Sequence, residues 1–222
     1  MGRGRSGRVS ANAASPRVNK TQSHPQITDI NAYGDTRLDE PDRVEWLKNT
    51  LGTSDAQAYT DEETIYSFTG GGFDDMHWNR NTVGNDVIDA IIDNPNSPVY
   101  VGEQYRGLKI RESDMKQGVT PQQFINNIIK TGIWHEDGAT SFSASLSVAD
   151  SFAGWHGNQG GYVSVVVKYQ NPTTGMPIKH LSQFSYEDEV LHSRKQMTNG
   201  YKIVNSQWLT GNKKVVITIA DR

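Results

Sequence analysis

The stretch Val99-Tyr-Val-Gly-Glu-Gln-Tyr-Arg-Gly-Leu-Lys-Ile110 marks the point at which the pattern of this chain changes. It follows Pro98 and is rich in valine and tyrosine, which favour β-strands. Before it, apolar residues recur at helical spacing, and from residue 140 onward short runs of β-branched and aromatic residues predict strands. Because helices come first and strands later, the sequence predicts the α+β class and not a doubly wound parallel sheet.

The helices and strands expected on either side of this stretch follow from caps and breakers. A helix over 39–52 ends at Gly52, and a second begins at a capping box of Thr60 and Glu63 and ends at the glycines 70–72. A third carries the apolar residues of 87–92 and stops before Pro95. Further helices are expected over 120–132 and 148–155. The expected strands are 140–145, 162–169, 187–192, 201–209 and 213–220, the last two joined by 210–212.

Composition excludes several kinds of protein. The 222 residues suffice for one domain. The chain has no cysteine, so disulfides, thiolate nucleophiles and cysteine-based metal sites are excluded. Its six histidines show no metal-ligand spacing, and we expect no metal. The net charge is −3 although the first 24 residues hold five basic residues and no acidic one, so the remainder is acidic and does not favour nucleic acid.

Residues 1–35 form a segment rich in Gly, Ser, Asn, Arg and Pro without apolar periodicity. We expect a disordered basic tail there and one domain over 36–222. Gly2, Gly4 and Gly7 match the dinucleotide fingerprint GxGxxG, but no strand pattern precedes them and no helix pattern follows. The tail lacks the apolar stretch of a signal peptide, and no run reaches the roughly 18 residues of a membrane span. The expected location is therefore cytoplasmic.

Three polar motifs stand in expected strands. Arg106 is followed by Gly107, which would let another group approach the backbone closely. A serine cluster, Ser141-Phe-Ser143-Ala-Ser145, comes next, and Glu187-Asp-Glu189 precedes Val-Leu. Residues two apart on a strand share a face, so Glu187 and Glu189 are expected to project together. A solvated strand face with ordinary hydroxyls is the alternative interpretation.

In this order the three motifs resemble the Arg-Ser-Glu class of mono-ADP-ribosyltransferases. This class includes enzymatic components of clostridial binary toxins and tailed-phage enzymes that modify host proteins. Ile65-Tyr-Ser-Phe-Thr-Gly-Gly-Gly-Phe73 also resembles the Tyr-Thr-Gly helix end of the family, and the similarity spans about 58–220. Two positions depart from the pattern: Ala144 replaces the central threonine of Ser-Thr-Ser, and His77 stands where an asparagine is expected.

The resemblance implies a reaction and a set of catalytic residues. The bond between nicotinamide and ribose in NAD breaks through a cation-like transition state, which fixed negative charge stabilises. By resemblance Glu189 supplies that charge, and Ser143 orients it from the neighbouring strand. Glu187 would receive the acceptor, because an acidic residue at this place marks the arginine-modifying members, and a guanidinium needs a carboxylate to accept its proton.

The resemblance also implies how NAD is bound. Arg106 would contact the pyrophosphate or a ribose, since its planar charged group matches phosphate oxygens. Phe152 would pack against the nicotinamide side, although a place in the core is the more usual one for such a residue. Together with Gly107, Ser143 and Glu189, these residues form the expected cofactor-binding set. The implied fold is a helical N-terminal portion followed by a strand-rich core of two sheets around an NAD cleft.

The sequence thus predicts an arginine-directed mono-ADP-ribosyltransferase that releases nicotinamide from NAD. Its expected partner is a target protein with an acceptor arginine in a host or competitor cell, reached by phage delivery or by expression in the host cytoplasm. Neither a membrane nor a nucleic-acid partner is favoured. The alternatives are transfer to RNA or another acceptor, an NAD glycohydrolase, and a catalytically silent virion-associated binding module.

Overall fold

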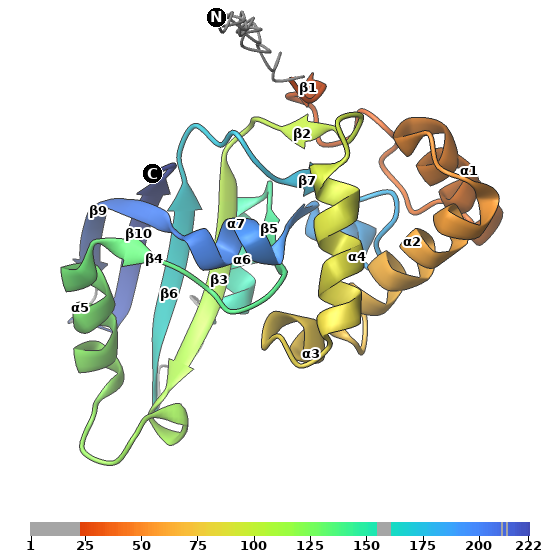
Figure 1. Cartoon of the computed structure of the whole chain (residues 1–222). Helices are drawn as coiled ribbons and strands as arrows, with labels where there is room; N and C mark the ends of the chain where they lie inside the picture. Colours follow the sequence, from red (N-terminus) through yellow and green to blue (C-terminus); the bar gives the residue numbers. More distant parts are fainter. Residues whose placement is uncertain (1–22, 155–160, 210, 212) are drawn as a thin grey trace, which may run out of the picture.

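The computed structural model describes residues 23–154, 161–209, 211 and 213–222, and it has the predicted α+β class. Helices dominate the first part of the chain and strands the second (Figure 1). The helices are α1 Glu40–Leu51, α2 Asp55–Phe68, α3 Phe73–His77, α4 Thr82–Asp93, α5 Pro121–Thr131, α6 Leu146–Phe152 and α7 Arg194–Asn199, with the 3-10 turns η1 Glu112–Asp114 and η2 Ser185–Glu187. The strands are β1 Gln26–Ile27, β2 Val99–Tyr100, β3 Gln104–Arg111, β4 Ile133–Trp134, β5 Thr140–Ser143, β6 Tyr162–Tyr169, β7 Met176–Pro177, β8 Glu189–His192, β9 Tyr201–Leu209 and β10 Lys214–Ala220.

Eight strands form one hydrogen-bonded sheet in the order β4-β9-β10-β6-β3-β5-β8-β7. Strands β6 and β10 run parallel, and the other neighbours are antiparallel. The pairing of β3 with β6 is continuous from Gln104 to Arg111, whereas β3 and β5 share only the pair Tyr105 and Ser143. The core predicted as two sheets is therefore one eight-stranded sheet with a weak junction between β3 and β5, and β1 and β2 form a separate two-stranded sheet.

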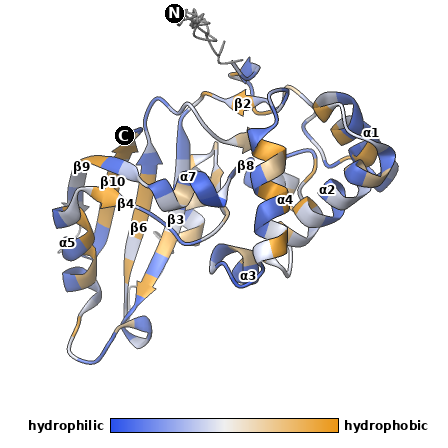
Figure 2. Cartoon of the chain, viewed as in Figure 1, coloured by the Kyte–Doolittle hydropathy of each residue, from blue (hydrophilic) through white to orange (hydrophobic). Residues whose placement is uncertain are grey.

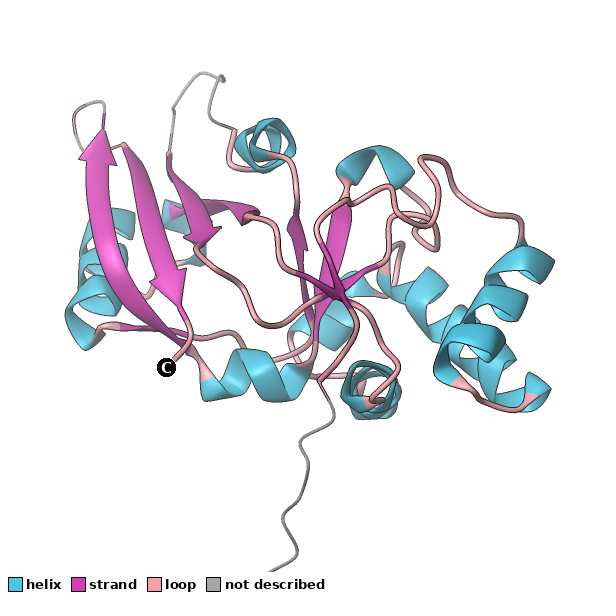
Figure 3. Cartoon of the chain, turned by 90° about the horizontal axis from the view of Figure 1, so that it is seen from above, coloured by secondary structure: helices cyan, strands magenta, loops and turns pink. Residues whose placement is uncertain are grey.

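Two hydrophobic cores lie on either side of this junction. The helical core joins α1, α2 and α4 to the β7–β8 end of the sheet, and Leu47, Ile88 and Leu191 belong to it. The sheet core joins α5 to the long strands and is rich in valine and isoleucine, such as Val165 and Ile217. Hydrophobic colour marks α4 and the long strands (Figure 2), and helices flank the strands at both ends in the view from above (Figure 3).

Several elements form where local signals predict them. Helix α1 ends at Gly52, whose positive φ of 68° suits a residue without a side chain. Helix α5 begins with Pro121 after Thr120, whose side chain accepts a hydrogen bond from Gln123 N in a complete capping box. Strands β6 and β9 have the predicted bounds. Local caps and periodicity therefore position much of the scaffold.

The predicted start of the second helix is wrong. Helix α2 begins at Asp55, because Ser54 accepts a hydrogen bond from Gln57 N and caps the helix earlier. Thr60 lies inside the helix, and its hydroxyl donates to Ala56 O instead of forming a capping box with Glu63. The short elements α3, α7, β4 and β7 were also missed, since two to six residues carry too little periodicity.

The ordered fold begins before the predicted residue 36. Strand β1 pairs in parallel with β2, and Lys179 Nζ donates to Asn31 Oδ1 over 2.6 Å, so residues of the expected tail contact the domain. The GxGxxG match at Gly2, Gly4 and Gly7 lies outside the described residues, as do two residues of the 210–212 connection. In the described ranges no helix has the length and apolar character needed to cross a bilayer.

Candidate active site

A pocket of about 290 Å³ opens where β3, β5 and β8 meet α6 and the C-terminal end of α2. This volume lies near the lower end of the roughly 300–1,000 Å³ typical of small-molecule sites. All six predicted site residues line the pocket, although they come from four separate parts of the chain: Arg106, Gly107, Ser143, Phe152, Glu187 and Glu189. The structure therefore brings the three sequence motifs together.

Gly107 allows helix α6 to pack directly against β3. A Cβ atom at this position would lie 1.8 Å from the carbonyl oxygen of Ala149, a distance that no side chain could occupy. The close approach predicted from the sequence is thus made by α6. It places Phe152 at the pocket with 52% of its surface exposed, so the alternative of a core position for Phe152 is wrong.

Glu187 and Glu189 do not project from one face of a strand. Glu187 ends the turn η2, Asp188 has a φ of +49°, and β8 begins only at Glu189. Because Asp188 has left-handed backbone geometry, the two glutamates do not alternate as they would along a strand. Both nevertheless line the pocket. Lys179 Nζ lies 2.8 Å from Asp188 Oδ1 and stabilises this conformation. The predicted convergence is confirmed, but a turn produces it and not strand alternation.

Glu189 is the most buried acid of the pocket, with 5% of its surface exposed. Its Oε2 atom accepts a hydrogen bond of 2.8 Å from Ser182 Oγ. Burial raises the pKa of Glu189 to about 7; hydrogen bonds from Ser182 and Ser141 lower it, as does the charge of Arg106. Glu189 consequently changes its charge close to neutral pH.

Ser143 does not have the contact that was predicted for it. Its hydroxyl donates to the carbonyl oxygen of Glu187 over 2.6 Å and accepts from Ser145 N over 2.9 Å. A hydroxyl has one proton to donate, and that of Ser143 is used on the backbone. Ser143 therefore fixes the main chain beside Glu189, and Ser182 makes the contact with the carboxylate.

Arg106 is held by two partners and keeps one nitrogen unpaired. Nη1 donates to Ser141 O over 2.9 Å, and Nη2 lies 2.9 Å from Glu136 Oε2. The residue is 8% exposed, and within the described chain its Nε makes no hydrogen bond. A buried guanidinium without an acidic partner is costly, so the Glu136 pair explains how Arg106 can stay at the pocket wall.

Sequence reasoning missed Glu136 and assigned no role to His77. Glu136 also accepts from Trp134 Nε1 over 3.1 Å and lies 3.5 Å from His77 Nε2. Burial, with the nearby charge of Arg106, lowers the pKa of His77, and its ring stacks on Phe73 at 5.2 Å. A buried arginine requires an acidic partner, so the sequence indicated that Arg106 would have one. No spacing rule identifies Glu136 as that partner.

The described residues contain no group of three or more histidine, aspartate or glutamate side chains that could hold a metal ion. The pocket itself is lined by acids, hydroxyls and an arginine. A buried acid with a raised pKa, a second acid beside it and a fixed cation are typical of a catalytic centre.

No family model and no curated protein sequence matches this chain. Solved structures do match. HopU1, an ADP-ribosyltransferase of Pseudomonas syringae pv. Tomato DC3000, has a TM-score of 0.55 at 12% identity, covering 81% of this chain and 87% of its own. The C3 exoenzyme of Clostridium limosum has a TM-score of 0.52 at 16% identity, and the match covers 90% of this chain and 98% of the exoenzyme. The ADP-ribosyltransferase Vis from Vibrio splendidus, in complex with agmatine, has a TM-score of 0.51 at 17% identity, and the match covers 83% of this chain and 86% of Vis.

These similarities show that the chain has the ADP-ribosyltransferase fold, as the sequence motifs predicted. Each structural neighbour is less than 20% identical to this chain, so the likeness concerns the fold.

Proposed function

We propose that this chain is a mono-ADP-ribosyltransferase that uses NAD and transfers ADP-ribose to arginine side chains of a target protein. One observation carries the proposal: Arg106, Ser143, Glu187 and Glu189 line a single pocket in a chain with the ADP-ribosyltransferase fold. Such residues occur separately in many proteins, and their convergence in this fold is what favours the activity.

The pocket suits the nicotinamide and ribose end of NAD. Phe73, Phe152 and Phe184 offer aromatic surface at its wall, against which a planar ring can stack. Arg106 lines the pocket and presents a positive charge, which would attract a phosphate or ribose oxygen. Glu189, at the buried end, would accept a hydrogen bond from a ribose hydroxyl.

The two glutamates would divide the reaction between them. The bond between the ribose C1′ and the nicotinamide nitrogen breaks, and nicotinamide leaves with the electron pair as a neutral molecule. The ionised Glu189 stabilises the positive charge that develops on the ribose. An acceptor guanidinium nitrogen forms the new bond to C1′, and its proton passes to Glu187.

Arginine is the acceptor that Glu187 favours. A guanidinium stays protonated at neutral pH, and a carboxylate can orient it and accept its proton. Burial raises the pKa of Glu187, which makes it a better proton acceptor than an exposed glutamate. The similar fold of Vis is found in complex with agmatine, a molecule that carries a guanidinium group.

The activity is tested with labelled NAD, using agmatine or lysate proteins as acceptors and nicotinamide release as a second readout. Glu189→Gln should lower both transfer and NAD hydrolysis by about 10²–10³-fold, because the charge opposite the transition state is lost. Glu187→Gln should lower transfer to guanidinium more than hydrolysis, since water needs no such orientation.

Glu63→Gln is the matched control, because Glu63 is exposed on α2 and lies outside the pocket. It should transfer ADP-ribose as the unmodified chain does. Absence of nicotinamide release under all conditions would leave a binding protein with this fold. Hydrolysis without any transfer to a guanidinium would make the chain an NAD glycohydrolase.

A further inference from the structure

Ser182 lies in the segment between β7 and η2, outside the three motifs, and is fully buried. Its Oγ donates to Glu189 Oε2 over 2.8 Å and accepts from Phe184 N over 3.0 Å. Because a backbone N–H can only donate, it occupies a lone pair of the hydroxyl and leaves the single proton for the carboxylate. With Glu189 ionised, the direction of this hydrogen bond is therefore fixed.

We propose that Ser182 is the positioning residue of Glu189, which holds its carboxylate in the orientation and charge state that catalysis requires. The catalytic consequence rests on the proposed function, whereas the contact itself does not. Ser143, the serine that the sequence favoured, donates its proton to Glu187 O and cannot replace Ser182.

Helix α2 fixes the place of Ser182. The next residue, Gln183, donates through its backbone N–H to Thr69 Oγ1 over 3.1 Å and through Nε2 to Tyr66 O over 2.8 Å. Gly70 leaves the space for this contact, because a Cβ there would lie 2.2 Å from Gln183 Nε2. The end of α2 thus anchors the segment that carries Ser182, and β8 carries Glu189.

This contact matters because Glu189 is buried. Burial alone pushes the pKa of Glu189 upward, and the hydrogen bond from Ser182 is the largest influence that opposes the rise to about 7. Without it, the carboxyl would keep its proton at neutral pH. A protonated Glu189 offers no negative charge to a developing cation, so a serine outside the three motifs would control the charge of the catalytic acid.

The test measures the titration of Glu189 directly, by carbon NMR of the full chain with labelled glutamate, with the signal assigned from Glu189→Gln. Ser182→Ala should raise the pKa of Glu189 by about one to two units, since hydrogen bonds to charged groups are among the strong ones. The acidic limb of the kcat profile for nicotinamide release should move upward by the same amount, while the KM for NAD changes less.

Ser182→Cys keeps a side chain of similar size with a weaker donor and should give an intermediate shift. It also serves where the alanine variant fails to fold. Ser97→Ala is the matched control, because Ser97 is equally buried and donates to Ile91 O far from the pocket. It should lower the unfolding midpoint and leave the titration of Glu189 unchanged.

An unchanged titration of Glu189 in both Ser182 variants would overturn the proposal, as would an equal shift in Ser97→Ala. Absence of NAD turnover in the unmodified chain would refute the proposed function instead. In that case the NMR titration would still decide whether Ser182 controls Glu189.

Discussion

The helical core and the sheet core differ in how they tolerate charge. The helical core is bordered by buried ion pairs, such as Arg43 with Glu62 at 2.7 Å. The sheet core consists of apolar side chains from β6 and β10, including Val167 and Ile217, packed beneath α5. The charged residues Arg106 and Glu189 lie where the two cores meet. A chain can keep charges buried where two packed regions both supply polar partners, and the catalytic pocket occupies that boundary.

The strand pair β5–β8 belongs to both cores at once. Phe142 of β5 packs in the sheet core, and its pairing partner Val190 is flanked by Leu191, which packs in the helical core. Ser143 and Glu189 end the same pair at the pocket. Movement of one core relative to the other would therefore shift the two residues that set the site.

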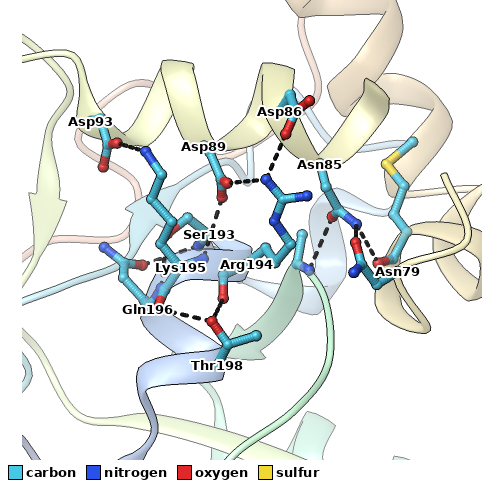
Figure 4. A network of polar contacts seen from close by, with 12 residues as sticks. Asn79, Asn85, Asp86, Asp89, Asp93, Ser193, Arg194, Lys195, Gln196 and Thr198 are labelled. Atoms are coloured by element: carbon cyan, nitrogen blue, oxygen red, sulfur yellow. Dashed lines mark hydrogen bonds and ion pairs between the residues drawn. The ribbon is translucent and has the colours of Figure 1, made fainter. Parts of the chain in front are cut away.

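A polar network between α4 and α7 also joins the regions (Figure 4). Arg194 contacts Asp86 over 2.5 Å and Asp89 over 2.8 Å, and Asn85 donates to Met76 O while accepting from Ala139 N. Asn85 is fully buried and links α4 to the chain that enters β5. These contacts fix the helical part against the sheet.

The largest expected loss of stability comes from truncating one buried side chain in either core. Ile88→Ala in the helical core and Ile217→Ala in the sheet core each remove a fully buried side chain and should cost about 2–5 kcal/mol of unfolding free energy. Because β5 and β8 tie the cores together, both variants should unfold in one transition. Urea denaturation followed by circular dichroism and by tryptophan fluorescence measures this.

Coincident transitions for the two probes would show one cooperative unit. If Ile217→Ala unfolded the sheet and left a separate helical transition, the cores would be independent. The boundary between them would then not be the reason why the charges of the site stay fixed.

A smaller effect is the loss of stability at low pH that two buried histidines cause, one beside each core. His180 packs on Trp46 beside the helical core, and His192 packs on Phe142 in the sheet core. Burial lowers the pKa of each to about 3. Below the ordinary pKa of 6.5, these histidines bind protons in the unfolded chain but not in the folded one. The free energy of unfolding therefore falls from its value above pH 6.5 as the pH approaches 3, by about 2 kcal/mol per histidine at pH 5.

The raised pKa of Glu189 acts in the opposite direction, because its folded form binds a proton between about pH 7 and its ordinary value and so gains stability as the pH falls. The histidines are therefore best compared in the Glu189→Gln background, by urea denaturation at pH 7.5 and pH 5. His180→Phe should reduce the loss at pH 5. An unchanged loss in that variant would show that protonation of His180 in the unfolded chain does not drive the pH dependence.

The smallest effect separates two acids that share Arg194. Asp89 has a side chain only 3% exposed, whereas that of Asp86 is 67% exposed. Asp89→Asn should cost about 1–3 kcal/mol, since it weakens a buried charge pair, and Asp86→Asn should cost less than about 0.5 kcal/mol. Thermal unfolding of the two variants measures the difference, and equal losses would show that burial does not decide the strength of this contact.

Local signals explain which parts of this molecule could be predicted. The capping residues of α5 and the valine-rich run of β6 act within a few residues, so the sequence indicates them directly. The start of α2 was mistaken because two possible caps, Ser54 and Thr60, compete within one helix. The partner of Arg106 could not be found, because Glu136 is thirty residues away and only pairing of distant strands brings it near.

The sequence by itself determined the class of the fold, the order of its longer helices and strands, and the identity of the acids, serines and arginine at the pocket, because these depend on residue type and local spacing. The tertiary structure alone decided which hydroxyl serves which group. A serine has one proton to donate, and only tertiary contacts, which set Ser182 beside Glu189 and Ser143 beside the carbonyl oxygen of Glu187, direct each proton to its acceptor.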